Sequence, residues 1–270
     1  MSTEATTTFF PDIRSNQLLG GLPGEFLARH RRDFKMIFHS TGEVLDAGGG
    51  REKRMLFPLD CVVSLVGAAR DGAHTEYAMV GREGAVGLSL FLGGGIADGK
   101  AIIERSGAAA HVPARLLSHE DCECGPLYTA LLHYTHAFIV DLSRTAVCNS
   151  LHSVEQRLCR WLLIAADRMQ ATRLRMTHER LAMLLGVSRE SVSIAAGRLQ
   201  RDSVIRYARG RISIDDRAAL ESFACDCYSP AKSDDRYRRD GSGSDQARPV
   251  PEASEATRPP LRDLRWNAGR

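Results

Sequence analysis

The sequence predicts an α+β fold in three successive parts: an N-terminal β jelly roll, a long connecting helix and a C-terminal winged helix-turn-helix. Short apolar stretches separated by glycines fill residues 16–125, where 18 of the 24 glycines lie, and this texture is typical of a jelly roll. An apolar row at spacings of three and four residues runs through 126–150 and predicts one helix. Two short helical patterns joined by a glycine follow within 151–228 and predict the third part.

The composition is that of an ordinary soluble protein. With 43% hydrophobic and 26% charged residues, 270 residues suffice for one or two domains with their own cores. Residues 1–11 are too polar for a secretory signal, and no apolar run approaches the roughly 18 residues of a membrane span. We expect a cytoplasmic protein without membrane contact, with a flexible arm over 1–15 and a disordered tail over 229–270, where few apolar residues occur.

Alternating apolar residues mark the strands of the jelly roll. Side chains two residues apart share one face of a strand, so an alternating set predicts a strand with one buried face. Glycines at 48–50, 72 and 93–95 separate these sets and predict turns, and short helices are expected near 24–32 and 113–118. The alternating sets are Phe34, Met36 and Phe38; Val63 and Leu65; and Tyr77 and Met79.

The helix over 126–150 has two apolar rows. Such a helix packs either on its own jelly roll or against the same helix of a second copy. We expect a dimer, with the main row as the contact, because two-fold symmetry suits the palindromic sites that helix-turn-helix proteins bind. The main row is Leu127, Leu131, Tyr134, Phe138 and Leu142, continued by Thr145 and Asn149, and the flanking row is Leu132, Ile139 and Ala146.

Residues 177–200 predict two short helices with a tight corner. Thr177 is an N-cap residue, and Gly186 reaches the left-handed conformation that a sharp helix exit needs. Ser188 then caps the second helix, and polar side chains in its first turn fall on the face opposite the apolar stripe. The apolar positions are Leu181, Leu184 and Leu185, with Val187 in the corner, then Val192, Ala195 and Leu199; the outer face is Arg189, Glu190, Ser193, Ala196 and Gly197.

This arrangement places a recognition helix in the DNA major groove. Arginine can donate two bonds to guanine, and glutamate can accept one from cytosine. The charge supports DNA contact, because residues 151–211 hold twelve arginines and five acids, which is +7, whereas the whole chain is +3 and the remainder is therefore −4. An ordinary helical hairpin is the alternative. The predicted DNA-contacting residues are Thr177, Ser188, Arg189, Glu190, Ser193 and Arg209.

Two further stretches complete the third part. A helix over 154–169 carries Leu158, Trp161, Leu162 and Ala165 on one side. After the second short helix, apolar residues flank a glycine turn at 208–210, which predicts a small hairpin, or wing, with Arg206, Arg209 and Arg211 beside the sugar-phosphate backbone. A last helix is expected over 216–225.

These parts, in this order, resemble the Crp/Fnr family of bacterial transcription regulators over about residues 16–227. The stretches that carry the resemblance are FPLDCVVSL, VGREGAVG, EQRLCRWLL and THERLAMLLGVSRESV. It implies a homodimer with a cyclic-nucleotide-binding-like sensor domain, whose winged helix binds a palindrome near promoters, and which contacts RNA polymerase if it is an activator. The family's base-reading positions carry over to Arg189 and Glu190, and a third falls at Ile194, so the half-site is expected to differ from that of the cyclic AMP receptor.

The resemblance also marks a missing nucleotide site. Family members that bind a cyclic nucleotide hold it with a glutamate and, about ten residues later, an arginine beside a serine or threonine. A buried phosphate needs such a charge partner. Here Leu88 stands at the glutamate position and Lys100 is the only nearby cation, so we expect no control by cyclic AMP, and the effector is unknown.

The seven cysteines leave a second kind of regulator open, one that responds to redox state or a metal. Residues 1–60 contain no cysteine, which argues against the N-terminal iron-sulfur cluster of some family members. His119, Cys122 and Cys124 form one group, and Cys225 with Cys227 another, but neither has the spacing of a zinc site. Reduced, incidental thiols are the simpler interpretation, so no metal ligand and no cofactor are assigned.

Two other classes of function remain as alternatives. The group His119, Glu120, Asp121 and Cys122, with His133 and His136, has catalytic side chains, but no phosphate-binding loop or nucleophile elbow accompanies it, so no catalytic residue is predicted. A signalling adaptor would use its cyclic-nucleotide-binding-like domain for protein contacts without binding DNA. Salt dependence separates these classes, because a DNA-binding protein loses affinity steeply as salt rises.

Overall fold

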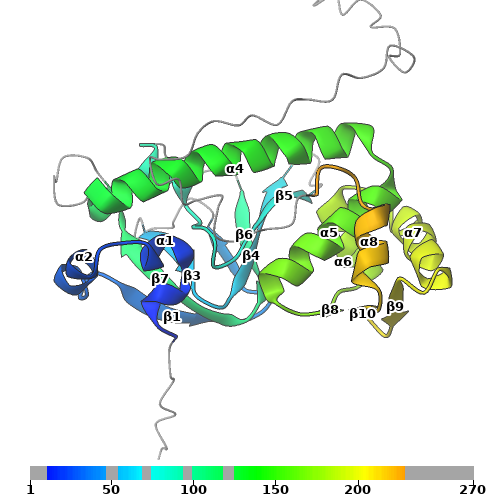
Figure 1. Cartoon of the computed structure of the whole chain (residues 1–270), viewed down its shortest axis with the longest axis horizontal. Coiled ribbons are helices and arrows are strands. Elements are labelled where there is room, and N and C mark those ends of the chain that lie inside the picture. The colour runs from blue at the N-terminus through cyan, green and yellow to red at the C-terminus, as the bar shows by residue number, and fades with distance from the viewer. Residues whose placement is uncertain (1–10, 47–53, 69–73, 94–98, 118–124, 229–270) are drawn as a thin grey trace, which may run out of the picture. The chain divides into compact units, whose positions relative to one another are not determined.

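A computed structural model describes residues 11–46, 54–68, 74–93, 99–117 and 125–228 (Figure 1). Two antiparallel sheets form the first part, one with strand order β1-β7-β3 and one with order β2-β6-β4-β5. The α+β class with a long helix and a C-terminal helix-turn-helix is as predicted. The strands are β1 (Lys35–His39), β2 (Val44–Asp46), β3 (Arg54–Pro58), β4 (Val62–Ala68), β5 (His74–Val80), β6 (Lys100–Arg105) and β7 (Gly107–Pro113).

The core of this part has two layers, because successive side chains of a strand point to opposite faces. On β3, Leu56 joins the cluster between the two sheets, whereas Met55 and Phe57 face the helices. The predicted strand residues Val63, Leu65 and Met79 are buried. The short helices around the sheets are η1 (Ile13–Ser15), α1 (Gln17–Gly20), α2 (Gly24–Arg29), α3 (Leu88–Phe91) and η2 (Ala114–Leu117).

The predicted alternation on β1 is wrong at its end. Phe34 and Met36 pack on the core, but Phe38 is exposed. β1 lies at the edge of its sheet and pairs only with β7, and His39 turns inward instead, with its Nε2 2.9 Å from Nε2 of His111. An edge strand is covered on fewer sides, so an apolar side chain there need not be buried.

The predicted arm over 1–15 is described only from residue 11 onward. There Ile13–Ser15 already form η1, which Asp12 caps by accepting a hydrogen bond from the Arg14 amide at 2.9 Å. The buried Asn16 then donates to the carbonyls of Pro58 and Gly84, each at 2.9 Å. Residues 13–15 of the predicted arm are therefore helical. The predicted tail over 229–270 lies outside the described residues.

The long helix is α4 (Gly125–Leu151), 27 residues that run across the sheets (Figure 1). Leu127, Leu131 and Tyr134 are buried in this chain's own core, and the Tyr134 hydroxyl donates to the Ala85 carbonyl at 3.0 Å. Phe138 also packs on that core, and Leu142 is half-buried. The main row assigned to a dimer contact is thus occupied within the chain, because the sheets lie against that side of α4.

The third part consists of helices on a three-stranded sheet of order β8-β10-β9. Its core contains the four predicted apolar residues of α5, together with Val62, Val66 and Met79 from the first part. Within this third part, β8 was not predicted from the sequence. The elements are α5 (Val154–Met169), β8 (Arg173–Arg175), α6 (His178–Leu185), α7 (Arg189–Arg201), β9 (Ile205–Ala208), β10 (Arg211–Ile214) and α8 (Arg217–Phe223).

No helix in the described ranges combines the length and the apolar character that a membrane crossing requires.

Candidate nucleic-acid interface

The corner between α6 and α7 has the predicted caps. The Thr177 hydroxyl accepts a hydrogen bond from the Arg180 amide at 3.1 Å, and the Ser188 hydroxyl accepts one from the Ser191 amide at 3.1 Å. Gly186 ends α6 at a φ of +62°. A residue with a β-carbon would be strained at that φ. Glycine therefore permits the sharp turn that sets α7 across α6.

One face of α7 is exposed. Arg189, Glu190 and Ser193 lie on it, and Ile194 is 55% exposed. Ala196 was predicted on this face, but it is only 2% exposed. It stands four residues after the buried Val192, so one helical turn returns it to the core side. In its first two turns the exposed face therefore holds Arg189, Glu190, Ser193 and the apolar Ile194, and the predicted Gly197 is exposed one turn later.

Contacts with α6 and β9 fix the first turns of α7. The Ser193 hydroxyl donates to the Arg189 carbonyl at 2.9 Å and lies 2.9 Å from Nδ1 of His178. The His178 ring stacks on Tyr207 of β9, with ring centroids 4.0 Å apart. Burial and the nearby charge of Arg189 lower the pKa of His178, which favours the neutral imidazole. Arg189 forms an ion pair with the exposed Glu179 at 3.3 Å, and because such an exposed pair is weak, its guanidinium can exchange this partner for another.

The predicted hairpin is present, and its turn is tight. Arg209 and Gly210 have φ values of +49° and +72°, and positive φ at two successive turn residues is typical of a type I′ hairpin. The Gly210 carbonyl accepts a hydrogen bond from the Met176 amide at 2.9 Å, which places the turn beside the start of α6. Thr177 and Arg209, both predicted to contact DNA, are therefore brought together.

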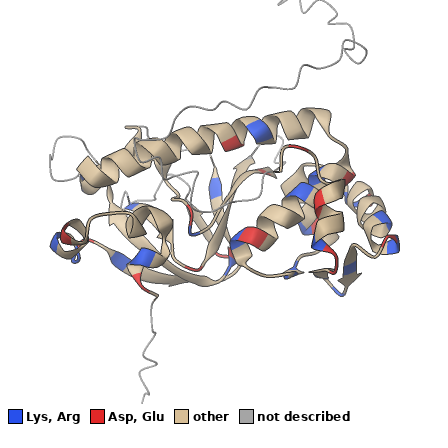
Figure 2. Ribbon diagram, viewed as in Figure 1, with Lys and Arg blue, Asp and Glu red and all other residues tan. Residues whose placement is uncertain are grey.

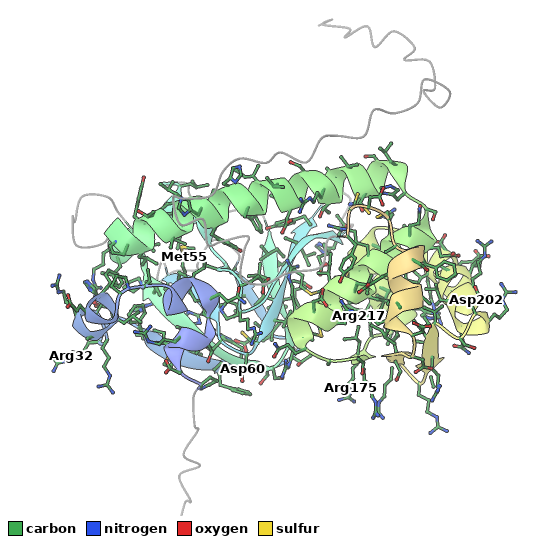
Figure 3. All side chains as sticks on the ribbon, viewed as in Figure 1. Arg32, Met55, Asp60, Arg175, Asp202 and Arg217 are labelled. Atoms are coloured by element: carbon green, nitrogen blue, oxygen red, sulfur yellow. The ribbon has the colours of Figure 1, made fainter. Side chains whose placement is uncertain are left out.

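Arginines line the small sheet. Arg175 of β8 and Arg211 of β10 are direct partners in the ladder, although like charges in that position destabilise a sheet. Arg206 pairs with Asp215 at 3.0 Å, but Arg175 projects away from the ribbon (Figure 3). Figure 2 colours the positions of Lys and Arg blue along the ribbon of α7 and of the small sheet. A binding partner with closely spaced negative charges would offset the repulsion.

The sequence analysis missed Arg173 and Arg175. The signal was the run Arg-Leu-Arg at 173–175, where Leu174 is buried between two exposed arginines. Alternation over three residues is too short to identify a strand, and the run became β8 only because it pairs with the wing.

The third part contacts the first through β5 and β6. The Trp161 indole donates to Glu76 Oε1 at 2.8 Å, and Arg168 pairs with Glu83 at 2.7 Å. Arg180 of α6 forms an ion pair with Glu104 of β6. Burial raises the pKa of Glu76 to about 7, although Ser64 and Trp161 donate to its carboxylate. Helices α5 and α6 are therefore in direct polar contact with the first part.

Residues 94–98 lie outside the described ranges, so the structure describes only part of the stretch from Leu88 to Lys100 that corresponds to the family's nucleotide site. Leu88, at the position of the missing glutamate, begins α3 and is half-buried. Lys100 begins β6 and is exposed.

The group at 119–122 and Cys124 also lie outside the described residues. His133 and His136 are both exposed on α4. The structure therefore gives no geometry for the catalytic alternative.

Residues 156–223 match the family model of the Crp-like helix-turn-helix domain. A CRP-family transcriptional regulator from Thermus thermophilus is similar in structure, with a TM-score of 0.60, 20% identity, and coverage of 73% of this chain and 100% of that one. A second regulator from that organism, of the CRP/FNR family, has a TM-score of 0.55 at 19% identity over 70% and 98% of the two chains. The c-di-GMP-responsive global regulator CLP of Xanthomonas campestris has a TM-score of 0.59 at 17% identity over 71% and 99%. No curated protein matches the sequence.

Proposed function

We propose that this chain is a transcription regulator of the Crp/Fnr type that binds a palindromic operator as a homodimer, because residues 156–223 match the Crp-like helix-turn-helix model and the fold is similar to that of such regulators. The observation that carries the proposal is the exposed first turn of α7, capped by Ser188 and flanked by the arginine-bearing wing. A helix N-terminus with donors on its outer face suits the DNA major groove.

Three side chains of α7 would read the bases. Arg189 would donate two hydrogen bonds to guanine O6 and N7, and Glu190 would accept from cytosine N4. Ile194, exposed one turn later, would contact a thymine methyl group. Ser193 is held by His178 and would position the helix rather than select a base.

The wing would contact the backbone. Arg209 stands at the tip of the turn, and Arg173, Arg175 and Arg211 lie on the adjacent strands. Because phosphates are the same at every step, these contacts add affinity without sequence preference and make it depend on salt.

The second copy would pack on the outer row of α4 rather than on the inner one. Leu132, Ile139 and Ala146 recur there at sevens and are all exposed. The hydroxyls of Ser143 and Ser150, which share this side, donate back to the Ile139 and Ala146 carbonyls, each at 3.0 Å, so they place no unsatisfied donor in an interface.

Charge also favours an interface on α4. Asp141 and Arg144 are its only charged residues, and they pair with each other at 3.2 Å. A solvated helix normally mixes charges along its outer face, whereas a helix in a dimer seam does not need them.

The signal that controls the protein would differ from cyclic AMP, since Leu88 and Lys100 cannot hold the ribose and the phosphate of a cyclic nucleotide as a glutamate and an arginine do. The relative from Xanthomonas campestris is c-di-GMP-responsive, so c-di-GMP is a sensible second titrant. Calorimetry with both nucleotides tests this, and micromolar binding of cyclic AMP would contradict it. We propose no catalytic activity, and a contact with RNA polymerase only if the protein activates transcription.

Selection from random duplexes tests the DNA-binding proposal. The enriched sequence should be an inverted repeat with half-site centres about one helical turn apart, and its affinity should fall steeply with salt. Enrichment of no sequence, together with no binding at low salt, would favour an adaptor that binds protein. Genome-wide immunoprecipitation would then locate the operators in the cell.

A further inference from the structure

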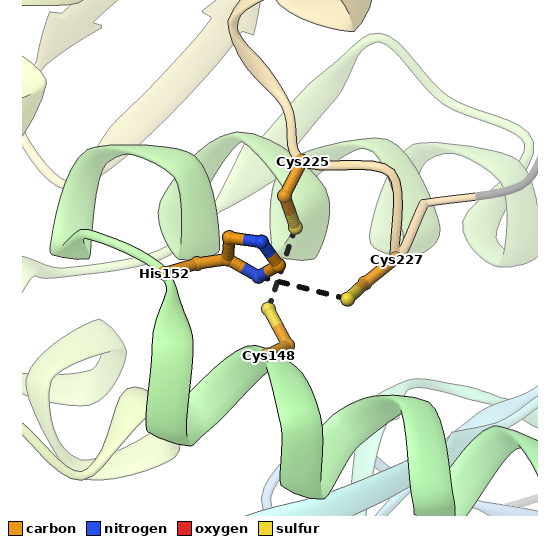
Figure 4. A group of neighbouring side chains, drawn as sticks. All are labelled: Cys148, His152, Cys225 and Cys227. Atoms are coloured by element: carbon orange, nitrogen blue, oxygen red, sulfur yellow. Dashed lines mark hydrogen bonds between the residues drawn. The ribbon is translucent and has the colours of Figure 1, made fainter. Parts of the chain in front are cut away.

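Four side chains with metal-binding atoms meet beside the end of α4. Cys148 and His152 come from the last turn of α4 and the residue after it, and Cys225 and Cys227 follow α8 (Figure 4). All four donor atoms lie within 4.8 Å of one another, although Cys148 and Cys225 are 77 residues apart. The sequence assigned no ligand here, because a Cys-x-Cys pair alone lacks the spacing of a metal site.

Two of the six distances between donor atoms match the edges of a tetrahedron around one ion, and all six are at most 4.8 Å. Sγ of Cys148 lies 3.5 Å from Sγ of Cys225, and Sγ of Cys227 lies 3.6 Å from Nδ1 of His152. Zinc bonds of about 2.3 Å to sulfur and about 2.0 Å to nitrogen put tetrahedral ligand atoms about 3.5–3.8 Å apart. We propose that these residues bind one Zn²⁺ ion as a Cys₃His site.

The backbone holds both pairs in place without an ion. Cys148 and His152 are four residues apart, and the His152 amide donates to the Cys148 carbonyl at 3.1 Å, so both side chains leave one face. The Tyr228 amide donates to the Cys225 carbonyl at 2.9 Å, which closes the turn that carries Cys225 and Cys227. The donors are therefore arranged before the metal binds.

Tyr228 fixes that turn to the module. Its hydroxyl donates to Asp167 of α5 at 3.0 Å and accepts a hydrogen bond from Arg217 of α8 at 2.7 Å. The Cys-x-Cys turn is thus tied to two helices of the winged module, whereas Cys148 and His152 belong to the end of α4.

Arg160 forms hydrogen bonds with both segments that carry the four donor residues. Its Nε donates to the Cys227 carbonyl at 3.3 Å and its Nη2 to the Thr145 hydroxyl at 3.2 Å, so it spans both segments. Three thiolates and one Zn²⁺ carry a net charge of −1, which the Arg160 guanidinium offsets. A half-buried arginine beside three thiols is the partner that an anionic metal site requires.

Other chemistry fits the cluster less well. A Cys148–Cys225 disulfide needs the sulfurs at about 2.05 Å and would leave Cys227 and His152 without a role. An iron-sulfur cluster spreads its ligands over several irons, so its thiolates stand farther apart than the ligands of one ion. A single zinc ion uses all four donors.

The ion would join the connecting helix to the winged module. It would bind the last turn of α4 to the segment after α8, next to the turn at Ser153 where α5 begins. The direction in which the module leaves α4 would then depend on the metal. Zinc loss or thiol oxidation would loosen this joint.

Metal analysis of the full chain tests the site. Protein purified under reductant without chelator should contain about one zinc per chain. Cys148→Ala, Cys225→Ala, Cys227→Ser and His152→Ala should each lose most of it. Cys61→Ala, which removes a buried cysteine of the first part, should retain it. Circular dichroism checks that each variant is folded. If the variants at the buried Cys148 and Cys225 do not fold, the variants at the half-buried Cys227 and His152 test the site instead.

Cobalt gives a readout that is independent of purification. Co²⁺ added to the reduced, metal-free chain should produce the sulfur-to-cobalt charge-transfer bands and intense visible bands of a four-coordinate thiolate site, and Zn²⁺ should abolish them. Absence of zinc together with absence of these bands would overturn the proposal. So would full zinc retention in the Cys227→Ser and His152→Ala variants, iron with sulfide in place of zinc, or a Cys148–Cys225 disulfide in metal-free protein kept from air.

Discussion

At the residue scale, Arg189 and Arg209 have different environments and should have different roles. Arg189 lies on the first turn of α7 in an exposed ion pair with Glu179, so its guanidinium can bind a guanine instead. Arg209 stands at the wing turn with φ of +49°, outside the recognition helix α7. One should select sequence, and the other should supply affinity alone.

Substitution separates the two roles. Arg189→Ala should cost about 1–3 kcal/mol on the selected operator and relax preference at one position of each half-site. Arg209→Asn, which suits the left-handed backbone, should weaken all duplexes alike and reduce the salt slope by about 1 per wing. Fluorescence anisotropy over a salt series measures both. Equal losses on operator and random DNA for Arg189→Ala would contradict its assignment.

The buried carboxyl group of Glu76 should make the free energy of unfolding depend on pH. Burial raises its pKa in the folded chain from 4.5 to about 7, so between these values the folded state binds more protons than the unfolded state. The free energy of unfolding should therefore fall as pH rises through this window, by on the order of 2–3 kcal/mol. Glu76→Gln keeps an acceptor for the Trp161 indole and should remove this slope, with a higher Tm at pH 8.

Thermal unfolding at pH 5 and pH 8 measures this effect. Glu179→Gln is the control, because its side chain is 72% exposed and its removal should leave the slope of the original chain. An unchanged slope in Glu76→Gln would show that the buried carboxylate is not the source.

At the element scale, α4 has an inner row that packs in its own core and an outer row that is exposed. Ile139→Glu, at the centre of the outer row, should convert a dimer of twice the 29.6 kDa chain mass into a monomer, because it buries a charge against its symmetry mate. Light scattering measures the mass.

A matched control is available on α7. Ile194 is 55% exposed and Ile139 is 56% exposed, so Ile194→Glu makes the same change at equal exposure. It should leave the mass unchanged while it abolishes operator binding. A dimer that survives Ile139→Glu would place the interface elsewhere.

At the scale of the whole molecule, local sequence signals predicted the helices and strands. The packing of these elements against one another determined which of their faces are buried. The caps at Thr177 and Ser188 and the glycine at 186 act within a few residues, so the helix-turn-helix was predictable. Which row of α4 packs on the chain's own core depends on residues distant in the sequence, from Leu18 to Leu117, so the spacing alone did not show that the inner row lies in that core.

The missed features share this cause. β8 exists because Leu174 pairs with Ile212 across the wing, and Ala196 is buried because α5 lies against α7. The zinc ligands proposed above come from two segments that no spacing rule connects. Sequence periodicity describes each element, but the contacts between elements require the fold.

Guanine N7 methylation protection tests the central claim, that the first turn of α7 reads bases in duplex DNA. The original chain should protect one guanine in each half-site of the selected operator, and Arg189→Ala should lose protection at that guanine alone while the remaining footprint persists. Continued protection of the same guanine in Arg189→Ala, or no footprint from the original chain at low salt, would contradict the account.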